Sequence, residues 1–204
     1  MKQWCSVIDT GGVIKRVSPD ECRSMLREQR KQLSLDLVKK KSAIISEKIM
    51  ASADFLTSQH MAYYLSHENE IDLSQVAVHA LNLKKSVYLP VFSAPHFLTF
   101  CRVDPNTQYR KNKFGILEPI STESISVDQL DLMFVPLVAF DASCNRMGRG
   151  LGCYDRYLQA SHPCKLMGVA YEFQKIAKIE PELWDVAMDG VVTESAIYTK
   201  NETR

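Results

Sequence analysis

The first part of the chain carries apolar residues at helical spacing, whereas the later part carries them in short unbroken runs. A helix is predicted to begin at residues 18–21 (Ser-Pro-Asp-Glu). Ser18 can cap free backbone N–H groups there, and the two acids oppose the positive end of the helix dipole. The helix is predicted to run to about Leu33. Ser34 can cap a second helix, which the apolar spacing extends to Phe55.

The apolar runs after residue 58 predict strands. These lie at 61–65, 86–92, 97–103, 132–140, 167–171 and 190–193, and a helix is predicted at 73–83. Runs without polar alternation are typical of strands buried on both faces, and therefore of a parallel sheet covered by helices. Pro136 cannot donate to a central ladder, so it indicates a bend or an edge position. The predicted fold class is α/β, a single three-layer domain with a mostly parallel sheet flanked by helices, Rossmann-like in its arrangement.

The composition favours one globular domain. With 204 residues, 46% of them hydrophobic and 24% charged, the chain can bury a core without a disulfide or a structural metal. We predict an irregular N-terminal arm at 1–17, with a turn at Gly11-Gly12, and a single α/β domain at 18–204. A monomer or a weak dimer is expected.

Charge and cysteine usage exclude several classes of function. The net charge of +1 gives no overall attraction to nucleic acid or to an anionic membrane. No apolar run approaches the roughly 20 residues of a membrane span. The six cysteines include no C-x-x-C pair and no zinc-like spacing. An even number of cysteines is compatible with an oxidising compartment, but scattered thiols in a chain with a large core favour a reduced, cytoplasmic protein.

The segment 145–158 (NRMGRGLGCYDRYL) carries the strongest chemical signal. It follows the apolar run 132–140, and its alternate glycines allow positive φ and a close approach of the backbone to a ligand. Successive N–H groups in such a loop form an anion site, and the guanidinium groups of Arg146 and Arg149 suit phosphate. The alternative is a surface turn with two solvated arginines. Its place after a strand favours the phosphate site, because open α/β sheets bind ligands at that edge.

Two further features bear on a phosphate ligand. Asp155 follows the glycines, and a carboxylate beside phosphate is repulsive unless a cation such as Mg²⁺ lies between them. Asp155 can equally cap the following helix. On the first helix, Arg23, Arg27, Arg30 and Lys31 share one face. Such a stripe is usually solvated, and in the functional interpretation one or two of these residues reach nucleotide phosphates.

Several segments together resemble one enzyme family. The segment 135–158 (VPLVAFDASCNRMGRGLGCYDRYL) is similar to the signature of the 5-formyltetrahydrofolate cyclo-ligases, in which an apolar strand ending in Ala-Phe-Asp precedes Arg-Leu-Gly, a glycine run and Tyr-Asp. Four other segments agree in order, namely a basic helix at 23–34, a strand-to-helix segment at 63–73, the loop FGILEP at 114–119, and an Asp-x-x-x-Asp segment at 185–195. The resemblance spans about residues 19–195.

The resemblance implies a fold and a reaction. The family has a single three-layer α/β domain and uses ATP and Mg²⁺ to convert the small-molecule folate 5-formyltetrahydrofolate to 5,10-methenyltetrahydrofolate. The formyl oxygen takes the γ-phosphoryl group, N10 attacks the resulting imino-phosphate carbon, and phosphate leaves. Phosphoryl transfer demands mainly positioning and charge neutralisation, which a basic glycine loop with a metal carboxylate can supply.

The resemblance also implies roles for residues. The expected catalytic residues are Arg149, as stabiliser of developing negative charge, and Tyr154. ATP is expected to contact Arg23, Arg146, Met147, Gly148, Arg149, Gly150, Leu151, Gly152, Cys153 and Tyr154. The folate is expected to contact Leu65, Glu70, Phe114, Glu118 and Tyr154, and Mg²⁺ to be held by Asp155 and Asp189. Taken singly, each of these residues has a plain structural alternative, such as core packing for Leu65 or a turn for Asp189.

The sequence departs from the family pattern at three positions. Pro19 stands where the family has a basic residue, Leu151 where it usually has Gly or Lys, and Cys153 where it usually has an aromatic residue. These changes leave two other functions open. One is an ATP-using enzyme of the same scaffold with a different N-formyl or amine substrate. The other is a module that binds folate or nucleotide without turnover.

Overall fold

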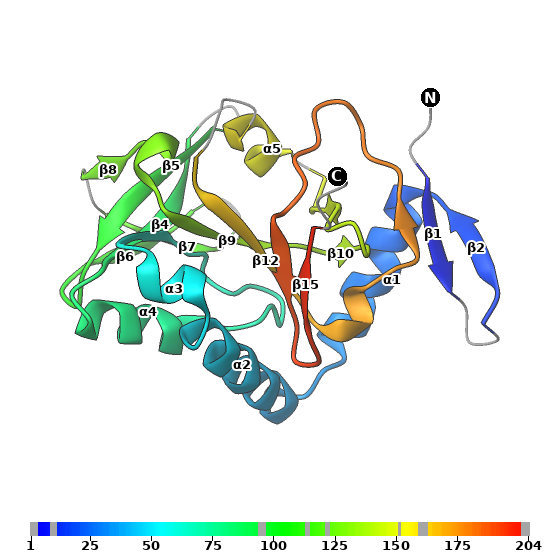
Figure 1. The fold of residues 1–204 in the computed structure, drawn as a ribbon, viewed down its shortest axis with the longest axis horizontal. Coiled ribbons are helices and arrows are strands. Elements are labelled where there is room, and N and C mark those ends of the chain that lie inside the picture. Colours follow the sequence, from blue (N-terminus) through cyan, green and yellow to red (C-terminus); the bar gives the residue numbers. More distant parts are fainter. Residues whose placement is uncertain are drawn as a thin grey trace.

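The computed structural model describes residues 4–8, 12–93, 97–112, 115–120, 123–150, 152–158 and 163–200. Within these residues, an eight-stranded sheet crosses the molecule in the order β15-β14-β12-β9-β3-β4-β5-β8 (Figure 1). Its strands are β3 (His60–Ala62), β4 (Ser86–Ser93), β5 (Phe97–Val103), β8 (Ser124–Ile125), β9 (Leu132–Pro136), β12 (Lys165–Val169), β14 (Gly190–Val192) and β15 (Ile197–Thr199).

The centre of this sheet is parallel. Strands β14, β12, β9, β3 and β4 run in one direction, and antiparallel strands extend the sheet at both edges. The α/β fold with a mostly parallel sheet is therefore confirmed. Residues Met133, Phe134 and Val135 of β9 are at most 1% exposed, as expected for a strand covered on both faces. Pro136 is the last residue of β9, which lies between β12 and β3, so the predicted edge position is wrong and the strand simply ends at the proline.

The helices follow the predicted caps. They are α1 (Pro19–Lys31), α2 (Leu35–Met50), α3 (Ala53–Thr57), α4 (Ser74–Asn82) and α5 (Cys153–Leu158). Ser18 and Glu21 form a reciprocal capping box at the start of α1, and Ser34 caps α2. The predicted second helix divides in two, because the hydroxyl of Ser52 accepts a hydrogen bond from the backbone N–H of Phe55 and starts α3.

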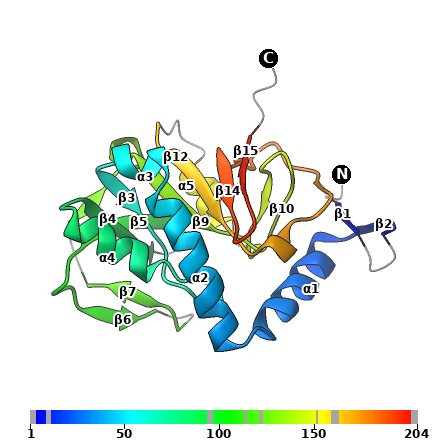
Figure 2. The same cartoon turned by 60° about the horizontal axis from the view of Figure 1, so that its bottom comes forward.

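The helices cover the sheet in layers. Ile45 of α2, Phe55 of α3 and Val76 of α4 belong to one buried cluster on one face of the sheet, whereas Leu158 of α5 belongs to the cluster on the other face. Figures 1 and 2 show α2 and α4 on the opposite side of the sheet from α5. The sheet therefore lies between two helical layers, and its carboxyl edge is left open for a site.

The N-terminal segment differs from the prediction of an irregular arm. Strands β1 (Cys5–Ile8) and β2 (Ile14–Val17) form an antiparallel hairpin, and β1 also pairs with β13 (Lys178–Ile179) (Figure 1). Cys5 and Val7 alternate with more exposed neighbours and pack against α1. The alternation extends over only four residues, which is too short to separate a strand from a coil by pattern alone. The division of the chain at residue 17 stays a prediction.

Smaller elements frame the carboxyl edge. Strand β10 (Ala139–Phe140) pairs with β11 (Arg146–Met147), and β6 (Tyr109–Lys111) pairs with β7 (Leu117–Pro119). Two 3-10 turns, η1 (Val127–Gln129) and η2 (Glu172–Gln174), complete the described elements. Because β10 and β11 form a hairpin directly after β9, the glycine segment returns across the carboxyl end of the sheet rather than leaving it.

Candidate active site

Two neighbouring cavities lie at the carboxyl edge of the parallel strands. The first, about 120 Å³, has mostly apolar walls, which include Tyr64, Leu65, Pro90, Phe92, Ile116, Leu117, Pro136, Leu137 and Tyr154. The second, about 460 Å³, has polar walls that include Arg23, Arg156, Glu182, Trp184 and Asp185. Four residues, Arg146, Gly148, Gly152 and Asp155, line both cavities. The glycine segment is therefore the wall that the two cavities share.

Glycine is required at two positions of this wall by backbone conformation. The φ angle is +97° at Gly150 and +61° at Gly152, in the region that side chains other than glycine seldom adopt. Gly148 has a different reason to be glycine. A Cβ atom built there would meet no protein atom within 4 Å, so its space opens into the cavities. The described glycines thus leave an uncovered stretch of backbone facing ligand space, as the sequence predicted.

Arg146 and Asp155 form an ion pair inside the shared wall. The Nη2 atom of Arg146 lies 2.6 Å from Oδ1 of Asp155, and Nη1 donates to the carbonyl of Val186. The backbone N–H of Val186 donates to the same Oδ1 at 3.3 Å. The Arg146 side chain is 4% exposed and that of Asp155 is 22% exposed. Asp155 is therefore held by several partners but keeps a face toward solvent.

The basic face of α1 is mostly engaged rather than solvated. The Nε atom of Arg23 donates to the carbonyl of Gly148 at 3.0 Å, which ties α1 to the glycine wall. Arg27 and Arg30 turn instead to the segment after β3, and Lys31 alone of the stripe is exposed. Of these four residues, Arg23 alone lines one of the two cavities, the second.

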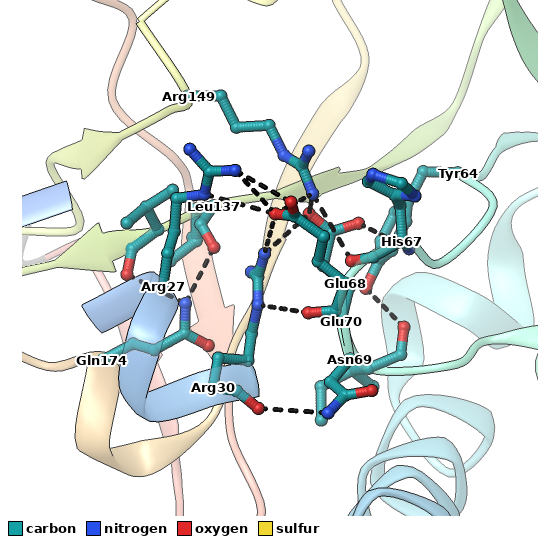
Figure 3. Close-up of polar contacts among 12 residues, drawn as sticks. Arg27, Arg30, Tyr64, His67, Glu68, Asn69, Glu70, Leu137, Arg149 and Gln174 are labelled. Atoms are coloured by element: carbon teal, nitrogen blue, oxygen red, sulfur yellow. Dashed lines mark hydrogen bonds and ion pairs between the residues drawn. The ribbon is translucent and has the colours of Figure 1, made fainter. Parts of the chain in front are cut away.

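Arg149 does not lie where its expected contact with the ATP phosphates would place it. Its Nη2 atom is 2.9 Å from Oε1 of Glu70, 3.5 Å from Oε2 of Glu68 and 3.4 Å from the carbonyl of His67 (Figure 3). Among the described residues, Arg149 lines the first cavity and not the second. In this structure the guanidinium thus sits beside the apolar cavity, paired with carboxylates.

Tyr154 and Glu70 face the first cavity together. Burial, and then the negative charge of Glu70, raise the pKa of the Tyr154 hydroxyl above its ordinary value. Tyr154 therefore stays protonated at neutral pH and can donate a hydrogen bond to a ligand. Leu65 also lines this cavity, so three of the expected folate residues come together here.

Two of the expected folate residues, Phe114 and Glu118, are not among these three. Phe114 lies outside the described residues, as does Leu151 of the glycine segment. Glu118 is 2% exposed, and its Oε1 accepts hydrogen bonds from the N–H of Phe92 at 2.9 Å and from Nδ2 of Asn112 at 2.8 Å. This carboxylate anchors β7 to β4, whereas its neighbour Leu117 lines the cavity. Glu118 therefore does not line the first cavity, but it holds in place the strand whose residue Leu117 does.

The two expected metal residues are separated. Asp189 directly precedes β14, and its carboxylate accepts a hydrogen bond from the N–H of Leu166 at 2.8 Å, at the amino ends of β14 and β12. Residues before parallel strands lie at the edge opposite to the cavities, and Asp189 lines neither of them. The structure therefore does not bring Asp189 to Asp155. The acidic residues that line the second cavity together with Asp155 are Glu182 and Asp185.

Four charged residues near the site were missed from the sequence, namely Glu68, Arg156, Glu182 and Asp185. Asp185 stands in the segment 185–195 that carries the family resemblance, and it lines the second cavity, whereas Asp189 lines neither cavity. Arg156 lines the second cavity one residue after Asp155. Glu68 had no signal in the sequence, because its partners Arg27 and Arg149 are brought to it only by the fold.

The chain is similar to known proteins over most of its length. The model of a protein family described as the 5-formyltetrahydrofolate cyclo-ligase family matches residues 15–194. A 5-formyltetrahydrofolate cyclo-ligase of Haemophilus influenzae is 36% identical, over 64% of this chain and 73% of its own length. The enzyme of the same name from Escherichia coli K12 is 30% identical, over 85% and 99%. The solved structure of Aquifex aeolicus 5,10-methenyltetrahydrofolate synthetase superposes with a TM-score of 0.81 at 29% identity, over 91% and 94%.

Two features are absent from the part of the chain that the structure describes. No helix there combines the length and the apolar character needed to cross a membrane. The same residues contain no cluster of three or more His, Cys, Asp or Glu side chains able to hold a metal by themselves. A pair of carboxylates remains sufficient for Mg²⁺, because phosphates and water complete its coordination shell.

Proposed function

The chain belongs to the 5-formyltetrahydrofolate cyclo-ligase family, and we propose that it uses ATP and Mg²⁺ to convert 5-formyltetrahydrofolate to 5,10-methenyltetrahydrofolate, with release of ADP and phosphate. In the proposed reaction, the formyl oxygen takes the γ-phosphoryl group of ATP. N10 then attacks the carbon of this imino-phosphate, and phosphate leaves. A formamide oxygen is a very poor leaving group, so its phosphorylation is what makes the ring closure feasible.

The first cavity suits the folate. Its apolar walls can cover the flat pterin ring, and the carboxylate of Glu70 can accept the paired N–H donors at the ring edge. The protonated hydroxyl of Tyr154 can donate to the formyl oxygen or orient the intermediate. Leu65 completes the apolar contact that the family resemblance implies.

The second cavity suits the nucleotide phosphates. Three arginines, Arg23, Arg146 and Arg156, line it together with the open backbone of Gly148. The wall shared with the first cavity is the place where a terminal phosphate and a formyl oxygen can meet. Arg149 borders that wall and is the proposed stabiliser of the negative charge that develops during transfer.

The carboxylates of the second cavity fit Mg²⁺. Asp155 and Asp185 both line it, and one or two carboxylates with phosphate oxygens are the ligands that Mg²⁺ prefers. We propose this pair in place of Asp155 and Asp189. When bound, the ion would neutralise phosphate charge beside Asp155, which explains why a carboxylate can stand next to an anion site at all.

One observation carries the proposal. Arg146, Gly148, Gly152 and Asp155 line an apolar and a polar cavity at once, so a folate and a triphosphate can approach each other without either leaving its own site. A protein that only stored a folate or a nucleotide would not need both cavities to converge on one metal carboxylate.

The test is an assay of the purified protein with ATP, Mg²⁺ and 5-formyltetrahydrofolate, followed by the near-ultraviolet absorbance of the methenyl product. Product that requires both ATP and the metal supports the proposal. Hydrolysis of ATP without product indicates a related enzyme with another substrate, and binding without turnover indicates a binding module.

A pair of variants sharpens this assay. Arg23→Gln should raise the KM for ATP by about tenfold, the loss expected for one charge-assisted hydrogen bond, and leave the KM for folate nearly unchanged. Arg102→Gln removes an arginine whose side chain is 49% exposed, and it serves as the control with unchanged kinetics. Equal effects of the two substitutions would argue against phosphates in the second cavity.

A further inference from the structure

The turn that carries Glu68 is unusually constrained. Glu68 and Asn69 have φ angles of +51° and +57°, in the left-handed region that non-glycine residues rarely occupy. The surroundings hold them there. The Nδ2 atom of Asn69 donates to the carbonyls of Arg30, Lys31 and Leu33 at 3.3, 3.3 and 3.1 Å, and the hydroxyl of Tyr171 donates to the carbonyl of Asn69 at 2.8 Å. The turn therefore presents Glu68 in a fixed direction.

Glu68 lies at the centre of a cluster of five charges (Figure 3). Arg27 grips its carboxylate with contacts of 2.9 Å to Oε1 and 2.8 Å to Oε2. Arg149 reaches the same Oε2 at 3.5 Å, and Arg30 reaches it at 3.9 Å. Glu70 completes the cluster with its contacts of 2.9 Å to Arg149 and 3.5 Å to Arg30. Three guanidinium groups thus share two carboxylates, and each carboxylate that is diverted leaves an arginine short of a partner.

The two carboxylates differ in what they can reach. Glu70 lines the first cavity, where the proposed folate site lies, whereas Glu68 lines neither cavity. A folate that takes the hydrogen bonds of Glu70 must therefore displace Arg149 from its 2.9 Å partner. Glu68 remains as the weaker hold on Arg149, because Arg27 already occupies most of its acceptor positions.

Building on the proposed function, we propose that Glu68 is a positioning residue, which together with Glu70 keeps Arg149 withdrawn from the nucleotide phosphates until folate occupies Glu70. Folate binding then releases Arg149 toward the shared wall. Each substrate consequently tightens the binding of the other. Glu68 sets the size of this coupling through its contact with Arg149. Glu68 itself contacts neither substrate.

The test measures the dissociation constant of a non-hydrolysable ATP analogue with Mg²⁺, by calorimetry, with and without saturating 5-formyltetrahydrofolate. The unmodified chain is expected to bind the analogue about tenfold more tightly with folate present, within the usual range of coupling between sites. Glu68→Gln is expected to tighten binding without folate and to reduce the coupling to about twofold. A merely structural role would weaken nucleotide binding instead.

A double-mutant cycle identifies the route of the effect. In an Arg149→Ala background, Glu68→Gln is expected to change the coupling no further, because Glu68 acts through that guanidinium. The control is Glu123→Gln, which removes one carboxylate from an exposed ion pair with Arg102 and should leave the coupling as it is. Unchanged coupling in Glu68→Gln, or an equal loss in both backgrounds, overturns the inference.

A second variant and the behaviour of the unmodified chain separate the possible causes of a negative result. Should Glu68→Gln fail to fold, Glu68→Asp withdraws the carboxylate by one methylene, and its coupling must then be intermediate, with unchanged coupling overturning the inference. Failure of the unmodified chain to bind either ligand speaks against the proposed function. Binding of both ligands without coupling speaks against Glu68 alone.

Discussion

Arg146 and Asp155 meet at 2.6 Å in the wall that the two cavities share. The guanidinium occupies one oxygen of the carboxylate, and the other oxygen has no contact with Arg146 at this distance. A cation in the second cavity would therefore share Asp155 with Arg146 rather than replace it. In the proposed reaction, this arrangement would place a fixed positive charge and the metal-binding carboxylate on the same side of the phosphate that is transferred.

The metal residues can be separated by three matched substitutions. Asp155→Asn and Asp185→Asn should each raise the Mg²⁺ concentration needed for half-maximal rate by about tenfold, because each removes one anionic ligand from the second cavity. Asp189→Asn should leave this requirement unchanged. It should instead lower the free energy of unfolding by about 1 kcal/mol, since its carboxylate accepts from Leu166. The measurement is the initial rate as a function of Mg²⁺ concentration for each variant. If only Asp189→Asn raised the Mg²⁺ concentration for half-maximal rate, Asp189 would be a metal ligand and Asp185 would not.

Arg149 is expected to act on turnover more than on binding. Arg149→Ala should reduce kcat by about 100-fold, the loss typical of one donor to a developing charge, and raise the KM for ATP at saturating folate by no more than about tenfold, the coupling that Arg149 carries. Steady-state kinetics with both substrates varied provide the measurement, with Arg102→Ala as the exposed control. A variant that binds ATP poorly yet turns over normally at saturation would contradict this role.

Two glycines should separate catalysis from folding. Gly148→Ala places a methyl group in open space, so the free energy of unfolding should be nearly unchanged while the KM for ATP rises. Gly190→Ala places Cβ 2.8 Å from the carbonyl oxygen of Tyr198, and should destabilise the protein by about 1–3 kcal/mol through the β14–β15 pairing. Urea unfolding measures the free energy of unfolding of each variant, and initial rates at varied ATP concentration give its KM for ATP. Normal ATP kinetics in Gly148→Ala would mean that no ligand approaches this backbone.

The charge of Glu68 predicts a pH dependence of stability. Burial alone would raise its pKa, but the hydrogen bond from Arg27 and the positive charges of Arg149 and His67 outweigh burial and lower it. A carboxyl group with a lowered folded-state pKa contributes stability above its unfolded-state pKa of about 4.3, and this stability is lost as the pH falls through the lower folded-state value. The destabilisation caused by Glu68→Gln should therefore be full near neutral pH and shrink below about pH 4. Urea unfolding of both proteins over this range tests it, and a difference that grows in acid would contradict the assignment.

The elements that form by local rules could be predicted from the sequence. The capping residues Ser18 and Ser34 fixed the starts of α1 and α2, and the unbroken apolar run of β9 indicated a central buried strand. The break at Ser52 was missed because the apolar spacing continues through it, although its hydroxyl starts a new helix. Hairpin β1–β2 was missed because two four-residue strands have too short a pattern and depend on distant β13 for pairing.

Only part of the candidate site could be predicted from the sequence. The glycine segment and Asp155 were expected to lie together, and both line the second cavity, because the residue types that a phosphate site would need stand in one continuous stretch. The pairing of Arg149 with Glu68 and Glu70 could not, because it joins residues about 80 positions apart whose meeting depends on the whole sheet. Likewise, the choice between Asp185 and Asp189 depends on which edge of the sheet each one faces, and a sequence pattern alone does not contain that information.

The side-chain amide of Asn69, which reaches the last carbonyls of α1, has a consequence for building hybrid proteins. Helix α1 and the turn at 66–70 are separate in sequence but are joined by hydrogen bonds and ion pairs, so we expect that they must be exchanged together. Consider a chimera that receives the first helix of a relative without that relative's turn. The last carbonyls of its helix would lack the side-chain amide that donates hydrogen bonds to them. The arginines of the helix would also lose their carboxylate partners. Only transplants that carry both pieces should preserve the spacing between the two cavities.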